Sequence, residues 1–123
     1  MRRYSEYKRN DINYLNNRAV ELTGSAQEID LAKSEHFKCI ITGTTTMSIK
    51  GFNETALDAV FIELVNGGLG IISWPNEIKW MDPLGTMVDK PSLAKITFHS
   101  TASDWILLWS TNGGDTINAK VMR

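Results

Sequence analysis

The sequence predicts an all-β protein, an antiparallel β-sandwich of the jelly-roll type with an extended or partly helical N-terminal arm. Two observations support this fold class. From Ile29 onward, apolar segments of strand length alternate with polar or glycine-containing turns. About seven or eight such segments at close spacing are typical of sandwiches. The 123 residues also suit one domain, which can bury about two-thirds of its unfolded surface.

The first 24 residues differ in composition from the rest, so we expect an arm over residues 1–24 and a sandwich over 25–123. Five basic and three acidic residues leave the arm at +2, and its sparse apolar residues cannot form a core. The arm is either a disordered tail or a segment that orders against a partner, with a short helix possible over residues 11–20. Tyrosine and arginine are favoured in contacts, so the candidate attachment residues are Arg2, Arg3, Tyr4, Tyr7, Arg9 and Tyr14.

Seven segments have the composition or the alternation of strands. They are residues 36–41, 44–50, 60–65, 69–74, 95–100, 105–110 and 117–121. Residues 44–50 show polar alternation, with Thr46, Ser48 and Lys50 on one side and Thr45, Met47 and Ile49 on the other. Within residues 95–100, Ile96 and Phe98 share the side that faces the core.

A β-hairpin is expected between residues 60–65 and 69–74. Asn66, Gly67 and Gly68 join the two segments, and Asn and Gly accept the positive φ angles of a tight turn. Pro75 ends the second strand because proline has no N–H to donate to a neighbouring strand.

Some of these strands are apolar on both sides. Residues 60–65 and 105–109 carry apolar side chains at both odd and even positions, and residues 69–74 nearly do so. A single small sandwich buries only one side of each strand, so the second side needs another cover. A subunit interface is the simplest cover, and loops or the arm are the alternative. The candidate interface residues are Phe61, Val65, Ile72, Ile106 and Leu108.

Several short motifs, in order, resemble a β-sandwich module of bacteriophage tail fibres and head-decoration proteins. They are Ile29-Asp30-Leu31, Thr42-Gly43-Thr44-Thr45-Thr46, Leu64-Val65-Asn66-Gly67-Gly68, Trp74-Pro75 through Lys79-Trp80, Pro91-Ser92-Leu93 and Ile96-Thr97-Phe98. The resemblance covers residues 25–110 and implies a virion protein that is usually a homotrimer. The chain departs from the family at residues 81–87, where the family is glycine-rich.

No catalytic residue, cofactor site or metal site is predicted. His36 and His99 fit no metal-ligand spacing, and the single cysteine, Cys39, forms neither a zinc set nor an internal disulfide. Cys39 lies in an apolar run, which favours a buried, unreactive thiol. Three carboxylates in separate loops are interpreted as solvated rather than as a glycosidase pair or calcium site: Asp82, Asp89 and Asp104.

The bulk charge and hydropathy exclude two classes of partner. The 13 basic and 14 acidic residues nearly balance, which argues against a nucleic-acid or membrane-surface binder. No apolar stretch reaches the roughly 18 residues that span a bilayer. No secretory signal is recognisable at the N-terminus, so we expect synthesis in the host cytoplasm and a final location in the virion.

The four tryptophans allow two interpretations. The favoured one places them in the core or in an oligomer contact, because large rings dominate such burial. In the other, Trp74 and Trp80 flank a proline turn and form a platform for sugars. The candidate receptor loop contains Trp80, Asp82, Met87 and Asp89.

We therefore expect a virion structural protein without enzymatic activity. Its arm would fix a capsid-decoration, head-fibre or tail accessory protein to the particle. The expected partners are other copies of the chain, capsid or tail proteins, and a host surface glycan. The alternatives are a tail-fibre tip protein that recognises such a glycan and a stand-alone carbohydrate-binding module. A small hydrolase is disfavoured because no active site is recognisable.

Overall fold

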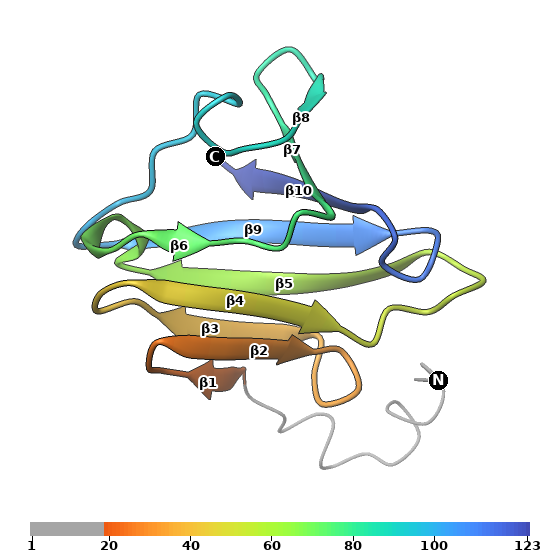
Figure 1. Ribbon diagram of the computed structural model, residues 1–123, viewed down its shortest axis with the longest axis horizontal. Helices are drawn as coiled ribbons and strands as arrows, with labels where there is room; N and C mark the ends of the chain where they lie inside the picture. The colour runs from red at the N-terminus through yellow and green to blue at the C-terminus, as the bar shows by residue number, and fades with distance from the viewer. Residues whose placement is uncertain (1–18) are drawn as a thin grey trace.

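The computed structural model describes residues 19–123, which form ten β-strands and one short 3₁₀ helix in two sheets (Figure 1). The seven-stranded sheet contains, in spatial order, β1 (Val20–Leu22), β3 (His36–Ile40), β5 (Asp58–Val65), β9 (Ser103–Ser110), β10 (Ile117–Met122), β7 (Ile78–Met81) and β8 (Met87–Val88). The three-stranded sheet contains β2 (Ala26–Asp30), β4 (Thr45–Lys50) and β6 (Ile72–Ser73). The predicted all-β class is confirmed.

The first half of the described chain winds as a short coil of parallel strands (Figure 1). It places β1, β3 and β5 in the larger sheet and the intervening β2, β4 and β6 in the smaller one, so each turn contributes one strand to each sheet. All pairings between successive turns are parallel. Val20 lies beside Phe37, and Phe37 lies beside Ile62, so apolar side chains stack from turn to turn. This winding is that of a small β-solenoid.

The segment from β5 to β6 rounds a corner between the two sheets and does not form the predicted hairpin. Asn66 has the left-handed conformation expected of it, with φ 57°, and it is followed by the 3₁₀ helix η1 (Gly67–Leu69). Beyond η1, Gly70 lies so close to the previous turn that an added Cβ would be 2.0 Å from the carbonyl oxygen of Gly43. The hairpin prediction is therefore wrong, because the turn sends the chain to the other sheet.

The second half of the chain extends the larger sheet with mixed pairing. Strand β9 runs antiparallel to β5, and β10 runs antiparallel to β9. Strand β7 then pairs with β10 in parallel, and β8 pairs with β7 in an antiparallel manner. The predicted antiparallel arrangement is wrong for the coil and for the pair of β10 and β7. A coil that returns to the same sheet after each turn necessarily brings its strands back in one direction.

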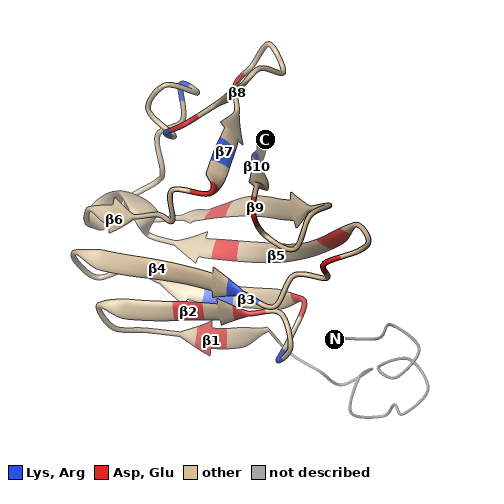
Figure 2. Ribbon diagram, turned by 45° about the vertical axis from the view of Figure 1, so that its right-hand side comes forward, with Lys and Arg blue, Asp and Glu red and all other residues tan. Residues whose placement is uncertain are grey.

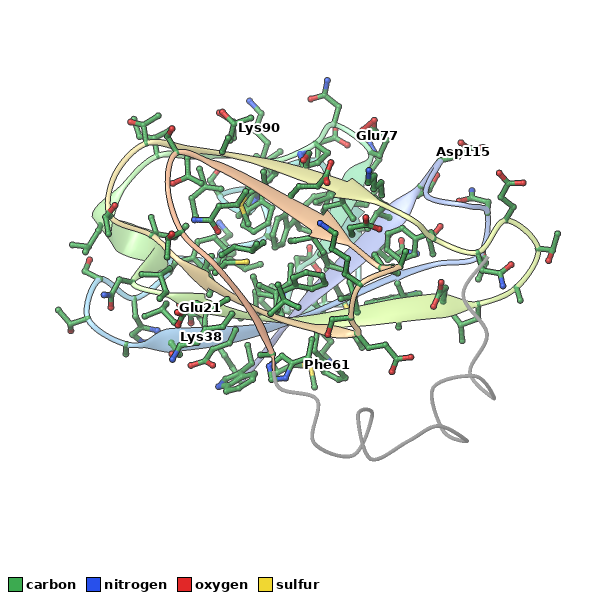
Figure 3. The ribbon with its side chains drawn as sticks, turned by 90° about the horizontal axis from the view of Figure 1, so that it is seen from below. Glu21, Lys38, Phe61, Glu77, Lys90 and Asp115 are labelled. Atoms are coloured by element: carbon green, nitrogen blue, oxygen red, sulfur yellow. The ribbon has the colours of Figure 1, made fainter. Side chains whose placement is uncertain are left out.

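The core fills the space between the two sheets, as Figure 3 shows. Alternate residues of each strand point into it, in keeping with the two-residue period of β-structure. In β4, Thr45 and Met47 are buried while Thr46 and Ser48 are exposed, as the sequence predicts. Fully buried side chains of both sheets meet there, including Ile29, Phe37, Cys39, Ile62, Leu64 and Ile106.

Residues 95–100 do not form the predicted strand. Lys95 has a φ of 64°, and the N–H of Ile96 donates to the carbonyl of Pro91, so a turn over residues 91–95 is followed by an irregular segment where the strand was expected. Ile96 and Phe98 nevertheless pack against the core, as their alternation predicts. The sequence interpretation also missed β7 and β8 as strands. It placed Val20–Leu22 in the arm, whereas these residues form the edge strand β1.

Candidate functional site

The outer face of the seven-stranded sheet carries the main apolar surface. On β5 and β9 the buried residues alternate with outward-facing ones, and the outward set is unusually apolar. We define the apolar face as Phe61, Val65, Trp105, Leu107, Trp109 and Met122. The strand register sets Phe61 beside Leu107, and Trp105 beside Met122. Phe61, Trp105 and Met122 are 45%, 42% and 46% exposed, while the other three residues are half-buried, so the described chain leaves part of this face uncovered.

Two of the predicted interface residues belong to this face and three do not. Phe61 and Val65 point outward from β5. Ile106 and Leu108 are fully buried, so their assignment to a surface is wrong. Strand β9 is apolar on both sides, and the sequence pattern gave no means of telling which side faces the core. Ile72 lies half-buried on β6 in the smaller sheet, far from this group in the topology.

A row of charged residues runs from the β1 edge of the sheet into the apolar face. Glu21, Lys38 and Glu63 lie in one row across β1, β3 and β5. In Figure 3, Glu21, Lys38 and Phe61 lie toward the same lower side of the molecule. Figure 2 shows that β5 and β9 themselves carry few charged positions. Charges also lie within the face, because the register sets Glu63 beside Trp105 and the exposed Lys120 beside Leu107. The outer surface of this sheet is therefore a mixed surface of large apolar side chains and single charged residues, a composition found in protein interfaces.

His36 lies beside Phe61 in the strand register, at the β3 side of the apolar face. Its ring lies 5.7 Å from the ring of Trp105, with an interplanar angle of 39°. The Nε2 atom of His36 is buried and has no hydrogen-bond partner. A buried polar atom without a partner is uncommon, so this position of the face is not fully satisfied within the described chain.

A cavity of about 710 Å³ lies on another part of the molecule, beside the segment that follows β6. Its apolar lining is formed by Ile72, Trp74, Pro75, Trp80, Ile96 and Phe98. Its polar lining is formed by Asn76, Lys79, Asp89, Lys90 and Ser92. A volume in the range of roughly 300–1,000 Å³ and a mostly apolar lining with a few polar groups are typical of small-molecule sites.

The predicted receptor-loop residues separate into two places. Trp80 and Asp89 line the cavity, although Trp80 is buried at 1% exposure and forms part of the floor. Asp82 instead organises a turn, because its Oδ1 accepts hydrogen bonds from the N–H groups of Leu84 and Thr86. Met87 lies half-buried in β8 and does not line the cavity.

Sequence reasoning missed most of the polar lining of the cavity. Asn76, Lys90 and Ser92 lie in turns whose position relative to Trp74 depends on the fold, and no local spacing brings them together. Phe98 was recognised only as a core residue. The Trp-Pro sequence at Trp74 was the one local signal that pointed to this region.

Asp104 is a buried carboxylate of β9, so the expectation that it is solvated in a loop is wrong. It ties the C-terminal end to the loop before β9. Its oxygens accept hydrogen bonds from the backbone N–H of His99 and from Arg123, at 2.8 and 2.9 Å, and one lies 2.9 Å from Nδ1 of the His99 ring. Burial alone would raise the pKa of Asp104, but these hydrogen bonds together lower it below the usual range. The group therefore stabilises structure rather than offering a reactive acid.

The remaining candidates for chemistry are unremarkable. Burial raises the pKa of the Cys39 thiol to about 12, so it stays protonated and unreactive. Within residues 19–123, no group of three or more His, Cys, Asp or Glu side chains could hold a metal ion. In the same part of the chain, no helix has the length and apolar character needed to cross a membrane. Comparisons with models of protein families, with curated proteins and with solved structures found no match.

Proposed function

We propose that this protein is a structural component of a bacteriophage particle, an oligomeric β-module joined to the particle by its N-terminal arm. The apolar face is the observation that supports association of this chain into an oligomer. Contiguous exposed apolar surface of this kind marks sites of association in soluble proteins. The virion role is supported by the motif resemblance, which also implies three copies in the oligomer.

A second copy of the chain is the occupant that the charge pattern favours. The row of Glu21, Lys38 and Glu63 alternates in sign from strand to strand. Two such rows facing each other with a shift of one strand would pair Lys38 with a glutamate of the other copy. A self-complementary patch of this type joins two copies about a two-fold axis. The face therefore supports a pair of copies, and the number three comes from the resemblance alone.

The arm leaves the described domain at a suitable place. It precedes β1, which is the edge strand of the same sheet that carries the apolar face. An arm that starts at this edge can reach a neighbouring particle protein while the sheet contacts another copy. The predicted attachment residues Arg2, Arg3, Tyr4, Tyr7, Arg9 and Tyr14 lie outside the described residues.

The oligomer is tested by measuring the molar mass of the chain in solution by light scattering. The wild-type protein should be an oligomer, and Leu107→Asp should be a folded monomer. The contact between copies would then have to bury a carboxylate together with Lys120, its neighbour in the strand register, and removing charged groups from water costs several kcal/mol. Thr46→Asp, on the exposed outer side of β4, is the matched control and should keep the wild-type mass. A monomeric wild-type protein across the concentration range would refute the proposal.

The attachment role is tested by removing residues 1–18, which leaves β1 intact. The truncated protein should fold and keep its oligomeric mass but should be missing from purified particles. Normal incorporation of the truncated protein would show that the arm is not the attachment segment.

A further inference from the structure

We propose that the cavity beside Trp74 binds an acidic saccharide, with a sugar ring on its aromatic lining and the sugar carboxylate at Lys90. This inference is independent of the oligomeric role, because it rests only on the residues of the cavity. It assigns a ligand class to the surface that the sequence associates with host recognition.

The aromatic lining provides the apolar part of the site. Trp74 packs edge-on against Trp80, with ring centroids 5.1 Å apart at 73°, and lies 6.3 Å from the ring of Phe98. Trp80 is buried, so Trp74 and Phe98, which are only partly buried, are the rings that a ligand would contact. Sugar rings present weakly polar C–H groups on their faces, and such groups pack well on aromatic rings.

The polar lining provides hydrogen bonds of the kinds that a sugar needs. Asn76 contributes an amide, Ser92 a hydroxyl and Asp89 a carboxylate at the same opening. The hydrogen bond from Lys79 and its positive charge lower the pKa of Asp89, so this carboxylate is an ionised acceptor for hydroxyl groups. Convergent polar groups around an apolar floor fix the orientation of a bound ligand.

The charge balance of the opening favours an anion. Lys79 and Asp89 form an ion pair with each other. Lys90 is exposed and forms no ion pair within the described chain, although its charge also acts on the neighbouring Asp89. Two lysines and one carboxylate therefore leave one net positive charge at the rim. A sugar carboxylate placed at Lys90 would form a charge-assisted hydrogen bond, which is about twice as strong as a neutral one.

The walls of the cavity are held in place before any ligand binds. On one side, the N–H of Gly68 donates to the carbonyl of His99 at 2.9 Å, which fixes the segment that carries Phe98. On the other side, the N–H of Leu93 donates to the carbonyl of Lys90 at 3.1 Å, and the buried Ala94 anchors the same loop. A preformed site loses less entropy on binding than one that must be ordered.

The cavity remains open when the apolar face is covered. Figure 3 shows Lys90 on the upper side of the molecule, opposite Phe61 and Lys38 on the lower side. An oligomer formed through the apolar face would therefore present several copies of the cavity outward. Repeated weak sites of this kind bind a polymeric glycan with raised avidity.

The proposal is tested by titrating the full chain with the trisaccharide of α-1,4-linked galacturonic acid. Tryptophan fluorescence and calorimetry report the binding. The methyl ester of the same trisaccharide is the uncharged control ligand. We expect the acid to bind, and both the ester and the variant Lys90→Glu to bind at least about tenfold more weakly, as for loss of one charged hydrogen bond. Lys33→Glu, an exposed lysine in a turn outside the cavity, should bind like the wild type.

A second variant, Ser92→Trp, places a bulky side chain at the exposed rim of the cavity and should abolish binding while the protein stays folded. Absence of binding by the wild-type chain, equal binding of the ester, or an equal loss in Lys33→Glu would each overturn the proposal. The molar mass of Lys90→Glu should equal that of the wild type. Failure of this site and failure of the oligomer are thus measured separately.

Discussion

The two outer faces of the molecule differ sharply, although both belong to sheets that enclose one core. On the smaller sheet, the outward residues of β4 are Thr46, Ser48 and Lys50, all exposed. On the larger sheet, the outward residues of β5 and β9 include Phe61 and Trp105, both more than two-fifths exposed. The smaller sheet has the alternation of a sheet with water on one side. The larger sheet has the composition of a strand pair that is covered on both sides.

The difference between the two faces supports the proposal that the outer face of the larger sheet is covered by another copy. The outward residues of β4 are polar or charged, so their exposure to water carries no free-energy penalty and this face requires no cover. An exposed phenylalanine and tryptophan on neighbouring strands leave apolar area in water, at about 25 cal/mol for each Å². The contrast between the two faces is therefore the physical argument for association, and it is independent of any resemblance to known proteins.

The largest expected effect comes from placing an aspartate on the buried side of β5, compared with an aspartate on its outward side. Leu64 is fully buried, and Phe61 lies on the opposite side of the same strand. Leu64→Asp should abolish folding, because an unpaired charge in the core is costlier than the total stability of most domains. Phe61→Asp should leave a folded monomer with wild-type circular dichroism. If Phe61→Asp also unfolds the protein, the assignment of the two sides of β5 is wrong.

A smaller but still large effect is expected at the corner that joins the two sheets. A Cβ on Gly70 would meet the backbone of Gly43 at 2.0 Å, whereas a Cβ on Gly43 would meet no atom within 4 Å. Gly70→Ala should lower the free energy of unfolding by on the order of 3 kcal/mol or more, and Gly43→Ala should change it by only about 0.5 kcal/mol. Chemical denaturation measures both. Equal effects would show that the turns of the coil are not stacked as described.

The smallest expected effect concerns Asp104. This carboxylate lies on the inner side of β9, whereas Trp105 lies on the outer side of the same strand. The pKa of Asp104 is lowered in the folded protein. The Asp104 carboxylate therefore binds a proton less readily in the folded protein than in the unfolded chain, where its pKa is about 3.9. Its stabilisation is therefore complete above that pH and is lost as the pH falls below it. Asp104→Asn should be less stable at pH 7 and lose less stability on acidification. Parallel pH curves for the two proteins would contradict this role.

The sequence predicted the faces of strands where one side was polar and failed where both were apolar. The sides of β4 follow directly from its alternation of Thr, Met and Ser. The sides of β9 do not, because residues 105–109 are apolar throughout and only the packing against β5 decides which of them are buried. The predicted surface role of Ile106 and Leu108 was therefore wrong, and Trp105, Leu107 and Trp109 take their place.

The topology was less predictable than the strands. Asn66 adopts the left-handed conformation that its residue type suggests, but a single turn angle does not determine whether the next strand pairs in a hairpin or joins another sheet. The parallel coil depends on contacts between turns, such as the approach of Gly70 to Gly43, which no local pattern reveals. The cavity was equally hidden, because Trp74, Lys90 and Phe98 meet only through the folded loop.

The most direct test of the central claim is hydroxyl-radical labelling of side chains on the assembled protein. The rate of oxidation of Trp105 and Met122 is measured by mass spectrometry in the wild-type chain and in Leu107→Asp. We predict that both residues are protected in the wild type and become reactive in the variant, while the exposed Leu84 reacts equally in both. Equal oxidation of Trp105 in the two proteins would mean that the apolar face stays in contact with water and that no second copy covers it.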